Sequence, residues 1–383
     1  MSLGLRPIAR SLRTIAQAAR YGRPTGEVST EEYARQYPDR WRPVVPPELP
    51  VRIPPQQLGP EAALFEPLGA IPELGVMEVP QGLVMGPHGW VFSSTGHLLV
   101  DCVWPYRATQ PKVLPKAFPK PRHLRGTCLN IASDWTTTNY GHFMMDGLSR
   151  YRLFTMSGID PQSIDYIYAP KADSDLTLQL MRRLGIPLEK CIWAQEEPCI
   201  RADVVLAPSF PGARHNYARW VVDFLRTARD TNGRGARRIY VPRGKARNIS
   251  NEGEILDVLR DFDFEIYDFT RFAGFEFFAD ADIVVGPHGA GLTNIAFCKP
   301  GTTIIDIIPS DHVYTFFYTI AASGDLNYNY ILGRSAERRT VKGGTSPFDF
   351  WVDPEVLRTA LKGLTEEAIR STSDTASELV KGL

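Results

Sequence analysis

The sequence has few of the features that mark several large protein classes. Its 43 basic and 43 acidic residues leave no net charge, which argues against a nucleic-acid binder, because such proteins usually carry a basic excess. Its five scattered cysteines form no Cys-x-x-Cys pair, so neither a zinc site nor a disulfide framework is predicted. No apolar run approaches the ~20 residues of a membrane span. A globular protein of a reducing cytoplasm is therefore expected.

Several common catalytic motifs are also missing. There is no Walker-type Gly-Lys-Ser/Thr and no Gly-x-Ser-x-Gly nucleophile elbow. The stretch "VVGPHGAGLTN", residues 284–294, differs from the dinucleotide fingerprint because Asn294 stands where a small residue is needed. P-loop enzymes, simple serine hydrolases and ordinary dinucleotide-binding proteins are thus not indicated.

The same stretch nevertheless favours an anion site. A β-branched apolar run at 283–285 predicts a buried strand, and the residues around His288 stop it. Gly289, Ala290 and Gly291 carry little or no side chain, so a ligand can approach the backbone N–H groups closely. Thr293 and Asn294 would lie at the entry of a following helix, where the helix dipole favours a phosphate. Plain turn chemistry between a strand and a helix is the alternative.

The length of 383 residues fits two domains of about 150 to 200 residues each. Strand and helix patterns alternate from Gly126, break at the polar segment 231–237, and then restart. This alternation predicts two Rossmann-like domains with parallel sheets covered on both faces, and an active site in a cleft between them. The predicted divisions are an N-terminal helix and arm, two α/β domains and a helical tail, at 1–60, 61–235, 236–345 and 346–383.

The first 60 residues predict two different segments. Five arginines, no acid and apolar residues at helical spacing occupy residues 1–23, which is typical of a basic amphipathic helix on an anionic membrane surface. A helix packed on the flank of the protein is the alternative. Residues 37–60 are too proline-rich for a helix or a central strand, so an extended arm with apolar anchors is expected.

A second candidate site lies in "NYGHFMMDGLSR", residues 139–150. Asn139 could cap a helix on which His142, Asp146 and Arg150 follow at spacings of four, on one face. A histidine beside a carboxylate is a common general base, and Asp146 is slightly preferred over His142 as the base. A surface row of ion pairs is the alternative.

Other polar residues have less specific patterns. Arg243 and Arg247 follow the first strand of the second domain, at its ligand edge, and could grip a diphosphate. Asp306 lies within an apolar strand and is expected to hydrogen-bond a ligand or the backbone. Three Asp-x-Asp triplets are explained by helix ends or strand entry, so no metal site is predicted.

These residues resemble glycosyltransferase family 61, whose bacterial members are often described as capsular polysaccharide biosynthesis proteins. The resemblance rests on the Asn-x-x-His-x-x-x-Asp-x-x-x-Arg helix at 139–150, on "GPHGAGLTNIAFCKPGTTIIDIIP", and on the arginine-bearing "IYVPRGKARNISNEGEILDVL". It covers roughly Gly126 to Pro309. Asp306 stands where many relatives have Glu.

The resemblance implies a GT-B architecture with two facing domains, and inverting transfer from a nucleoside-diphosphate sugar, expected to be UDP-linked, to a glycan or lipid-linked acceptor. The sugar would be a hexose, a pentose or an N-acetylhexosamine, and neither a cofactor nor a metal is required. His142 and Asp146 would be catalytic, while Asn139, Arg150 and His288 would contact substrate. The donor would be bound by the set Arg243, Arg247, Gly289, Ala290, Gly291, Thr293, Asn294 and Asp306.

Without an anchor run, a cytoplasmic enzyme of bacterial surface polysaccharide synthesis is expected, either free or peripheral on the inner membrane. A nucleotide-sugar epimerase and a non-catalytic nucleotide- or sugar-binding protein are the alternatives.

Overall fold

The computed structural model describes residues 5–102, 114–171, 174–213, 215–229, 236–335, 348–364 and 366. The chain forms two compact units. Unit 1 comprises Met1–Val51 and Leu68–Ala228, and unit 2 comprises Arg52–Pro67 and Arg229–Leu383. The second division falls beside the expected boundary at 235/236, whereas part of the proline-rich arm belongs to unit 2. The facing GT-B arrangement of the two units stays a prediction.

Unit 1 contains a ten-stranded mixed sheet among its described residues. Its parallel part has the order β10-β9-β8-β11. These strands are β8 (Arg122–Asn130), β9 (Tyr166–Ala169), β10 (Cys191–Trp193) and β11 (Cys199–Pro208). In chain order this is 3-2-1-4, as in one half of a Rossmann fold.

A wholly parallel sheet was predicted, but the other strands of this sheet make it mixed. They are β1 (Gly26–Val28), β2 (Trp41–Val45), β4 (Leu74–Pro80), β5 (Leu83–Met85), β6 (Trp90–Phe92) and β7 (His97–Leu99). β4 and β5 each pair antiparallel with a different part of β11, while β5, β6 and β7 form successive hairpins, because their links are too short for the crossovers that parallel pairing requires. Gly96, in the turn of the β6–β7 hairpin, has φ +89°.

The helices of unit 1 follow the expected alternation with one important shift. They are α1 (Leu5–Tyr21), α2 (Thr30–Gln36), α3 (Tyr140–His142), the π-helix η4 (Phe143–Leu148), α4 (Ser149–Met156), α5 (Asp175–Arg183) and α6 (Arg219–Arg226). Asn216–Tyr217 does not extend α6 but forms strand β13, which pairs with β12 (Gly212–Ala213). That hairpin gives Tyr217 a role in the site.

Unit 2 contains a seven-stranded sheet among its described residues, with the main order β15-β14-β16-β17-β18-β19. The strands are β14 (Arg237–Tyr240), β15 (Glu265–Ile266), β16 (Ala281–Pro287), β17 (Thr303–Pro309), β18 (Asn327–Ser335) and β19 (Phe350–Trp351). The first five are parallel and have the order 2-1-3-4-5 of doubly wound folds. The predicted parallel sheet is confirmed here.

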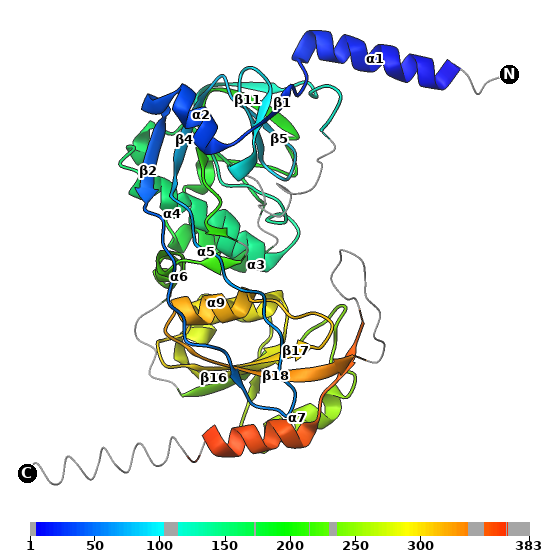
Figure 1. Ribbon diagram of the computed structural model, residues 1–383, viewed down its shortest axis with the longest axis vertical. Helices are drawn as coiled ribbons and strands as arrows, with labels where there is room; N and C mark the ends of the chain where they lie inside the picture. The colour runs from blue at the N-terminus through cyan, green and yellow to red at the C-terminus, as the bar shows by residue number, and fades with distance from the viewer. Residues whose placement is uncertain are drawn as a thin grey trace, which may run out of the picture. The chain divides into compact units, whose positions relative to one another are not determined.

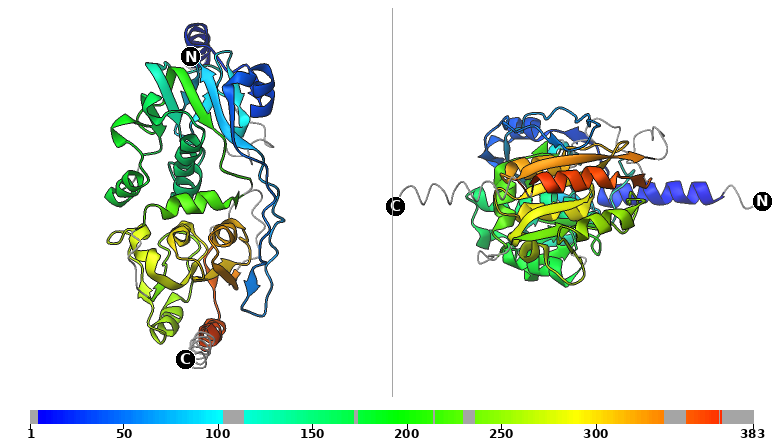
Figure 2. Two further views of the ribbon diagram at one scale, coloured as in Figure 1. Left: turned by 90° about the vertical axis from the view of Figure 1, so that its left-hand side faces the viewer. Right: turned by 90° about the horizontal axis from the view of Figure 1, so that it is seen from below.

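Helices cover both faces of this sheet (Figure 1). The helical segments are α7 (Glu252–Arg260), α8 (Gly274–Phe277), the 3₁₀ helix η8 (Ala290–Phe297), α9 (Phe316–Ser323) and residues 354–364. On one face, apolar residues of α7 and of the 354–364 helix share a core with Tyr240, Val285 and Ile305. Figure 2 shows this last helix in front of the strands when unit 2 is seen from below. It confirms the helical tail as far as residue 364, and most residues beyond that point lie outside the described part of the chain.

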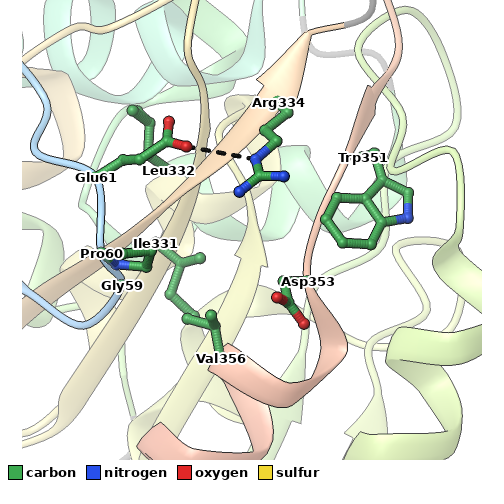
Figure 3. Close-up of a pocket in the computed structure, with 9 residues that line it drawn as sticks. All are labelled: Gly59, Pro60, Glu61, Ile331, Leu332, Arg334, Trp351, Asp353 and Val356. Atoms are coloured by element: carbon green, nitrogen blue, oxygen red, sulfur yellow. Dashed lines mark ion pairs between the residues drawn. The ribbon is translucent and has the colours of Figure 1, made fainter.

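The proline-rich arm runs along sheet edges, as expected of an extended segment. In unit 1, β2 pairs with β4, and in unit 2, β3 (Gln56–Gln57) pairs with β18. Beside β3, Glu61 meets Arg334 at 3.4 Å, and the Arg334 guanidinium lies over the Trp351 ring (Figure 3). The cavity there is about 20 Å³, enough for a single water, so it is too small for a ligand site.

Within the part of the chain that the structure describes, no helix has both the length and the apolar character needed to cross a bilayer.

Candidate functional site

In unit 1, candidate site residues gather where the strand order reverses. β8 and β11 are adjacent and parallel although two other strands separate them in the chain. Ligands of open α/β sheets bind at such a switch point, beside the carboxyl ends of the strands. The segment after β8 leads into α3 and η4, and the segment after β11 carries the β12–β13 hairpin.

Three side chains from these two segments form a hydrogen-bonded relay. Nδ1 of His142 lies 2.6 Å from Oδ2 of Asp146, and the Tyr217 hydroxyl donates to Oδ1 of Asp146 at 2.5 Å. Because a carboxylate accepts, Nδ1 of His142 carries the proton, and the other ring nitrogen, Nε2, faces away from Asp146. The predicted pairing of His142 with Asp146 is present, and Tyr217 is a third member that the sequence did not reveal.

The two members of the predicted pair differ in access. Asp146 is fully buried and both of its carboxylate oxygens accept hydrogen bonds, whereas the His142 side chain keeps 14% of its surface exposed. A general base must reach the proton that it removes. The geometry therefore argues against the expectation that Asp146 is the base in direct contact with the acceptor.

The helix that carries this pair changes winding within the site. Asn139 caps its start, accepting from the N–H groups of Gly141 at 2.9 Å and His142 at 3.4 Å. The next six residues form the π-helix η4 before α4 begins. Single π turns occur frequently at functional sites. The cap role of Asn139 is confirmed, and since its Oδ1 accepts these backbone bonds, the expected substrate contact has no support from its geometry.

Arg150 corrects the prediction of a continuous polar row. It is fully buried, and its guanidinium donates to the backbone carbonyls of Ala132, at 2.9 Å, and Cys102. Burial lowers the pKa of Arg150, an effect opposed by the charges of Cys102 and Asp146. Arg150 therefore holds the loop after β8 in place, and its expected contact with substrate stays a prediction.

In unit 2, the corresponding switch point lies between β14 and β16. Nη1 of Arg243, after β14, donates to the carbonyl oxygen of His288, after β16, at 2.7 Å. Gly289 makes room for this contact, since a Cβ there would collide with the Arg243 guanidinium. Its φ of −174° is ordinary extended backbone, so space rather than strain requires glycine. At Gly291, a Cβ would meet the Phe269 ring at 2.5 Å.

These contacts correct part of the glycine-loop hypothesis. The space beside the two glycines is occupied by protein side chains and is not left open for a ligand. Thr293 and Asn294 are fully buried inside η8, and Asn294 Nδ2 donates to the carbonyl of Gly291 at 3.0 Å. Their side chains therefore do not reach a ligand. The absence of a side chain at Gly289 makes the contact between Arg243 and the loop possible.

A second relay of the same chemistry lies in unit 2. Nδ1 of His288 is 2.8 Å from Oδ2 of Asp306, and the Tyr328 hydroxyl donates to the same oxygen at 2.7 Å. Burial, followed by the charge of Asp306, raises the pKa of Tyr328, so the hydroxyl stays a donor. Asp306 was expected to bond a ligand or the backbone, but its partners are two side chains.

Basic groups crowd around this second relay. Burial, followed by repulsion from His288, Arg247 and Arg243, lowers the pKa of His312 to about 2. Burial lowers the pKa of Arg243 to about 10, with Arg247 the next cause. The sequence did not point to His312, although its place just beyond the carboxyl end of β17 could have. The charges of Arg243 and Arg247, which repel each other, favour an anion here.

Metal ligands show no comparable grouping. Among the described residues, no cluster of three or more His, Cys, Asp or Glu side chains is arranged to hold an ion. Two of the Asp-x-Asp triplets are paired with cations instead, Asp261 with Arg358 at 2.6 Å and Asp282 with Lys299 at 2.5 Å. Asp173 lies outside the described residues. The need for a metal stays untested.

Comparison with known proteins found one family match. Residues 140–305 match the family model described as Glycosyltransferase 61, and no curated protein matches the chain. The matched segment begins at α3, includes both members of the His142–Asp146 pair, and continues through Arg243 and the His288 loop into β17. Residues 140–305 are thus similar to glycosyltransferase family 61.

Proposed function

We propose that the protein is an inverting glycosyltransferase that moves a sugar from a nucleoside-diphosphate donor, UDP by expectation, to a glycan or lipid-linked glycan. The observation that carries the proposal is the grouping of Arg243, Arg247, His288 and His312 at the switch point of unit 2, where the charges of the two arginines favour an anion. The family match supports a sugar transfer.

The donor diphosphate binds to unit 2 in this proposal. Arg243 and Arg247 donate to phosphate oxygens, and His312 adds a neutral N–H donor. The backbone N–H groups of Ala290 and Gly291, at the start of η8, contribute further donors. When the bond between the sugar and the diphosphate breaks, negative charge grows on the leaving phosphate. Fixed cationic groups stabilise that charge without a metal ion.

Unit 1 supplies the base. Nε2 of His142 takes the proton of the acceptor hydroxyl as its oxygen attacks the anomeric carbon. In the same displacement the bond from that carbon to the diphosphate oxygen breaks, so the configuration inverts and the nucleoside diphosphate leaves. Asp146 holds the ring through Nδ1 and stabilises the imidazolium, while Tyr217 fixes the carboxylate. We therefore propose His142 as the base and Asp146 as its orienting partner.

The experiment separates the donor site from the base. Thermal shift with UDP, GDP, CMP and TDP, with and without Mg²⁺, identifies the nucleotide and any need for metal. With the donor known, His142→Gly should lower kcat about 10²- to 10⁴-fold while nucleotide affinity stays unchanged. Added imidazole should restore part of the rate. Equal loss of nucleotide affinity and rate would contradict the assignment of His142 as the base.

Two other functions predict different results. An epimerase would convert UDP-sugar without any acceptor, and a binding protein would bind UDP but turn over no donor. Asp146→Asn tests the orienting role, since the amide can hold the ring in the wrong tautomer. A rate as low as that of His142→Gly supports the relay, and a wild-type rate contradicts it.

The cell location is proposed from α1. This helix carries arginines and no acid in its first turn, and Ile15 on its apolar face is 65% exposed. Its last turn is anchored to unit 1, where Gln17 Nε2 donates to the carbonyl of Phe118 at 3.0 Å. A basic helix with an exposed apolar face fits the anionic surface of a membrane. The enzyme would then work at the cytoplasmic face, on acceptors of surface polysaccharide synthesis.

A further inference from the structure

Trp135 lies in the loop between β8 and α3 and is turned toward solvent. The residue is 49% exposed, whereas its neighbours Asp134 and Thr136 are 1% and 2% exposed. A single exposed apolar side chain is normal on a protein surface. The exposure of Trp135 becomes informative only together with its backbone conformation and its position in the loop before α3.

The backbone of Trp135 is in the left-handed region, with φ +67°. This conformation is unfavourable for a bulky residue. Hydrogen bonds of the loop impose it: the Trp135 carbonyl accepts from the N–H groups of Thr138, at 3.1 Å, and Asn139, at 2.9 Å. Ser133 and Thr136 bond to each other on the other side. The loop therefore holds the indole outward at a cost in backbone strain.

Strain of this kind recurs at the two switch points. Six non-glycine residues among those described have positive φ, and three of them lie in the segments after β8, β11 and β14, three of the four strands that flank the switch points. They are Trp135, His215 and Arg247. Strained residues persist where the surrounding structure holds them, and they cluster at ligand sites. The His215 ring lies 6.0 Å from that of His142, so this strain borders the relay.

The same loop fixes both Trp135 and the base. Asn139, whose N–H bonds the Trp135 carbonyl, caps the helix in whose first turn His142 lies. We infer that Trp135 binds the acceptor, with its indole against the apolar C–H face of a pyranose ring, close to the hydroxyl that His142 deprotonates. This inference rests on the proposed function and adds the acceptor class, a pyranose-containing glycan.

The test compares two exposed tryptophans in the full chain. Trp135→Ala removes the inferred contact, and Trp351→Ala is the matched control, since Trp351 is 37% exposed and lies on β19, outside the site. The probe is a panel of methyl pyranosides and disaccharides, measured by saturation-transfer NMR with saturating UDP. Wild type and Trp351→Ala should bind the same sugars, while Trp135→Ala should lose about tenfold in affinity. Trp135→Phe should recover part of the loss.

Three outcomes would overturn the inference. The first is unchanged sugar binding in Trp135→Ala, and the second is a wild-type protein that binds no member of the panel. The third is a change in oligomeric state on Trp135→Ala, measured by sedimentation, which would assign the indole to a protein contact. Failure of the proposed function is seen separately, as absence of UDP-sugar turnover in the wild type, and sugar binding at Trp135 does not require turnover.

Discussion

At the scale of single residues, both candidate sites use the same arrangement of a histidine, a buried aspartate and a tyrosine. In each, the aspartate accepts from the tyrosine hydroxyl and holds Nδ1 of the histidine. The surroundings separate their roles. Each histidine lies beside another one, His142 beside His215 and His288 beside His312, but only the second pair is close to arginines, Arg243 and Arg247. The first arrangement suits proton transfer and the second suits anion binding.

The contact of Arg243 with the glycine loop gives a sharp prediction. Gly289→Ala places a methyl group where the guanidinium lies, so Arg243 must move and donor affinity should fall roughly five- to twentyfold, a loss of about 1–2 kcal/mol. Gly244→Ala is the control, because a Cβ at Gly244 meets no atom within 4 Å. Titration with UDP by calorimetry measures both. Equal affinities of the two variants would show that Arg243 does not bind the donor.

The buried His312 predicts a pH dependence of stability. Its pKa of about 2 in the fold lies below the value near 6.5 of an unfolded histidine, so the unfolded state takes up the proton first as pH falls. The stability associated with neutral His312 is complete above pH 6.5 and is lost progressively below it, by about 1–2 kcal/mol between pH 7 and 5.

His312→Gln keeps a neutral polar group and should flatten this dependence. Denaturant unfolding of both proteins at pH 7, 6 and 5 measures the difference. A slope that is the same with and without His312 would contradict the buried neutral state.

At the scale of elements, the helix from Tyr140 to Met156 decides which predicted side chains can act. Its α-helical start keeps Asn139 and His142 at the carboxyl edge of the sheet, whereas the buried Arg150, after η4, donates to backbone carbonyls. Sequence spacing assumed a regular helix, so it placed Arg150 in the site. The neighbouring carbonyls, which no sequence pattern marks, draw the guanidinium inward.

Arg150→Met tests that structural role. It leaves the carbonyls of Ala132 and Cys102 without the Arg150 donor, so the free energy of unfolding should fall by about 3 kcal/mol. The melting temperature should fall by roughly 6–10 °C. Arg152→Met on the same helix is the control, because Arg152 is exposed. Calorimetric melting of both variants gives the answer, and similar melting temperatures would mean that Arg150 contributes little to the fold.

At the scale of the whole molecule, the chain builds two α/β units that each present a switch point. Parallel strands and crossover helices follow from the alternation in the sequence, and that prediction is confirmed for unit 2 and for the parallel part of unit 1. The hairpins that complete the unit 1 sheet were not all predicted, because short apolar runs do not reveal their partners.

Membrane contact is a property of the full chain and can be measured directly. Replacing Arg6, Arg10, Arg13 and Arg20 by Gln should reduce co-sedimentation with phosphatidylglycerol vesicles by at least tenfold, since each basic residue near an anionic surface contributes about 1 kcal/mol. Binding to neutral phosphatidylcholine vesicles is the control. Equal sedimentation of the two proteins with anionic vesicles would mean that α1 packs against protein.

The sequence by itself determined the family resemblance, the alternating strands and helices, the pairing of His142 with Asp146 and the arginines at the edge of unit 2. These depend on local pattern and on residue type at fixed spacing, which a chain carries without folding. Only the tertiary structure placed Tyr217 against Asp146, brought His312 near His288, directed the buried Arg150 toward backbone carbonyls, and set Arg243 against the glycine loop. These features depend on contacts between segments far apart in the chain. Burial and hydrogen-bond partners are set only when those segments come together in the fold.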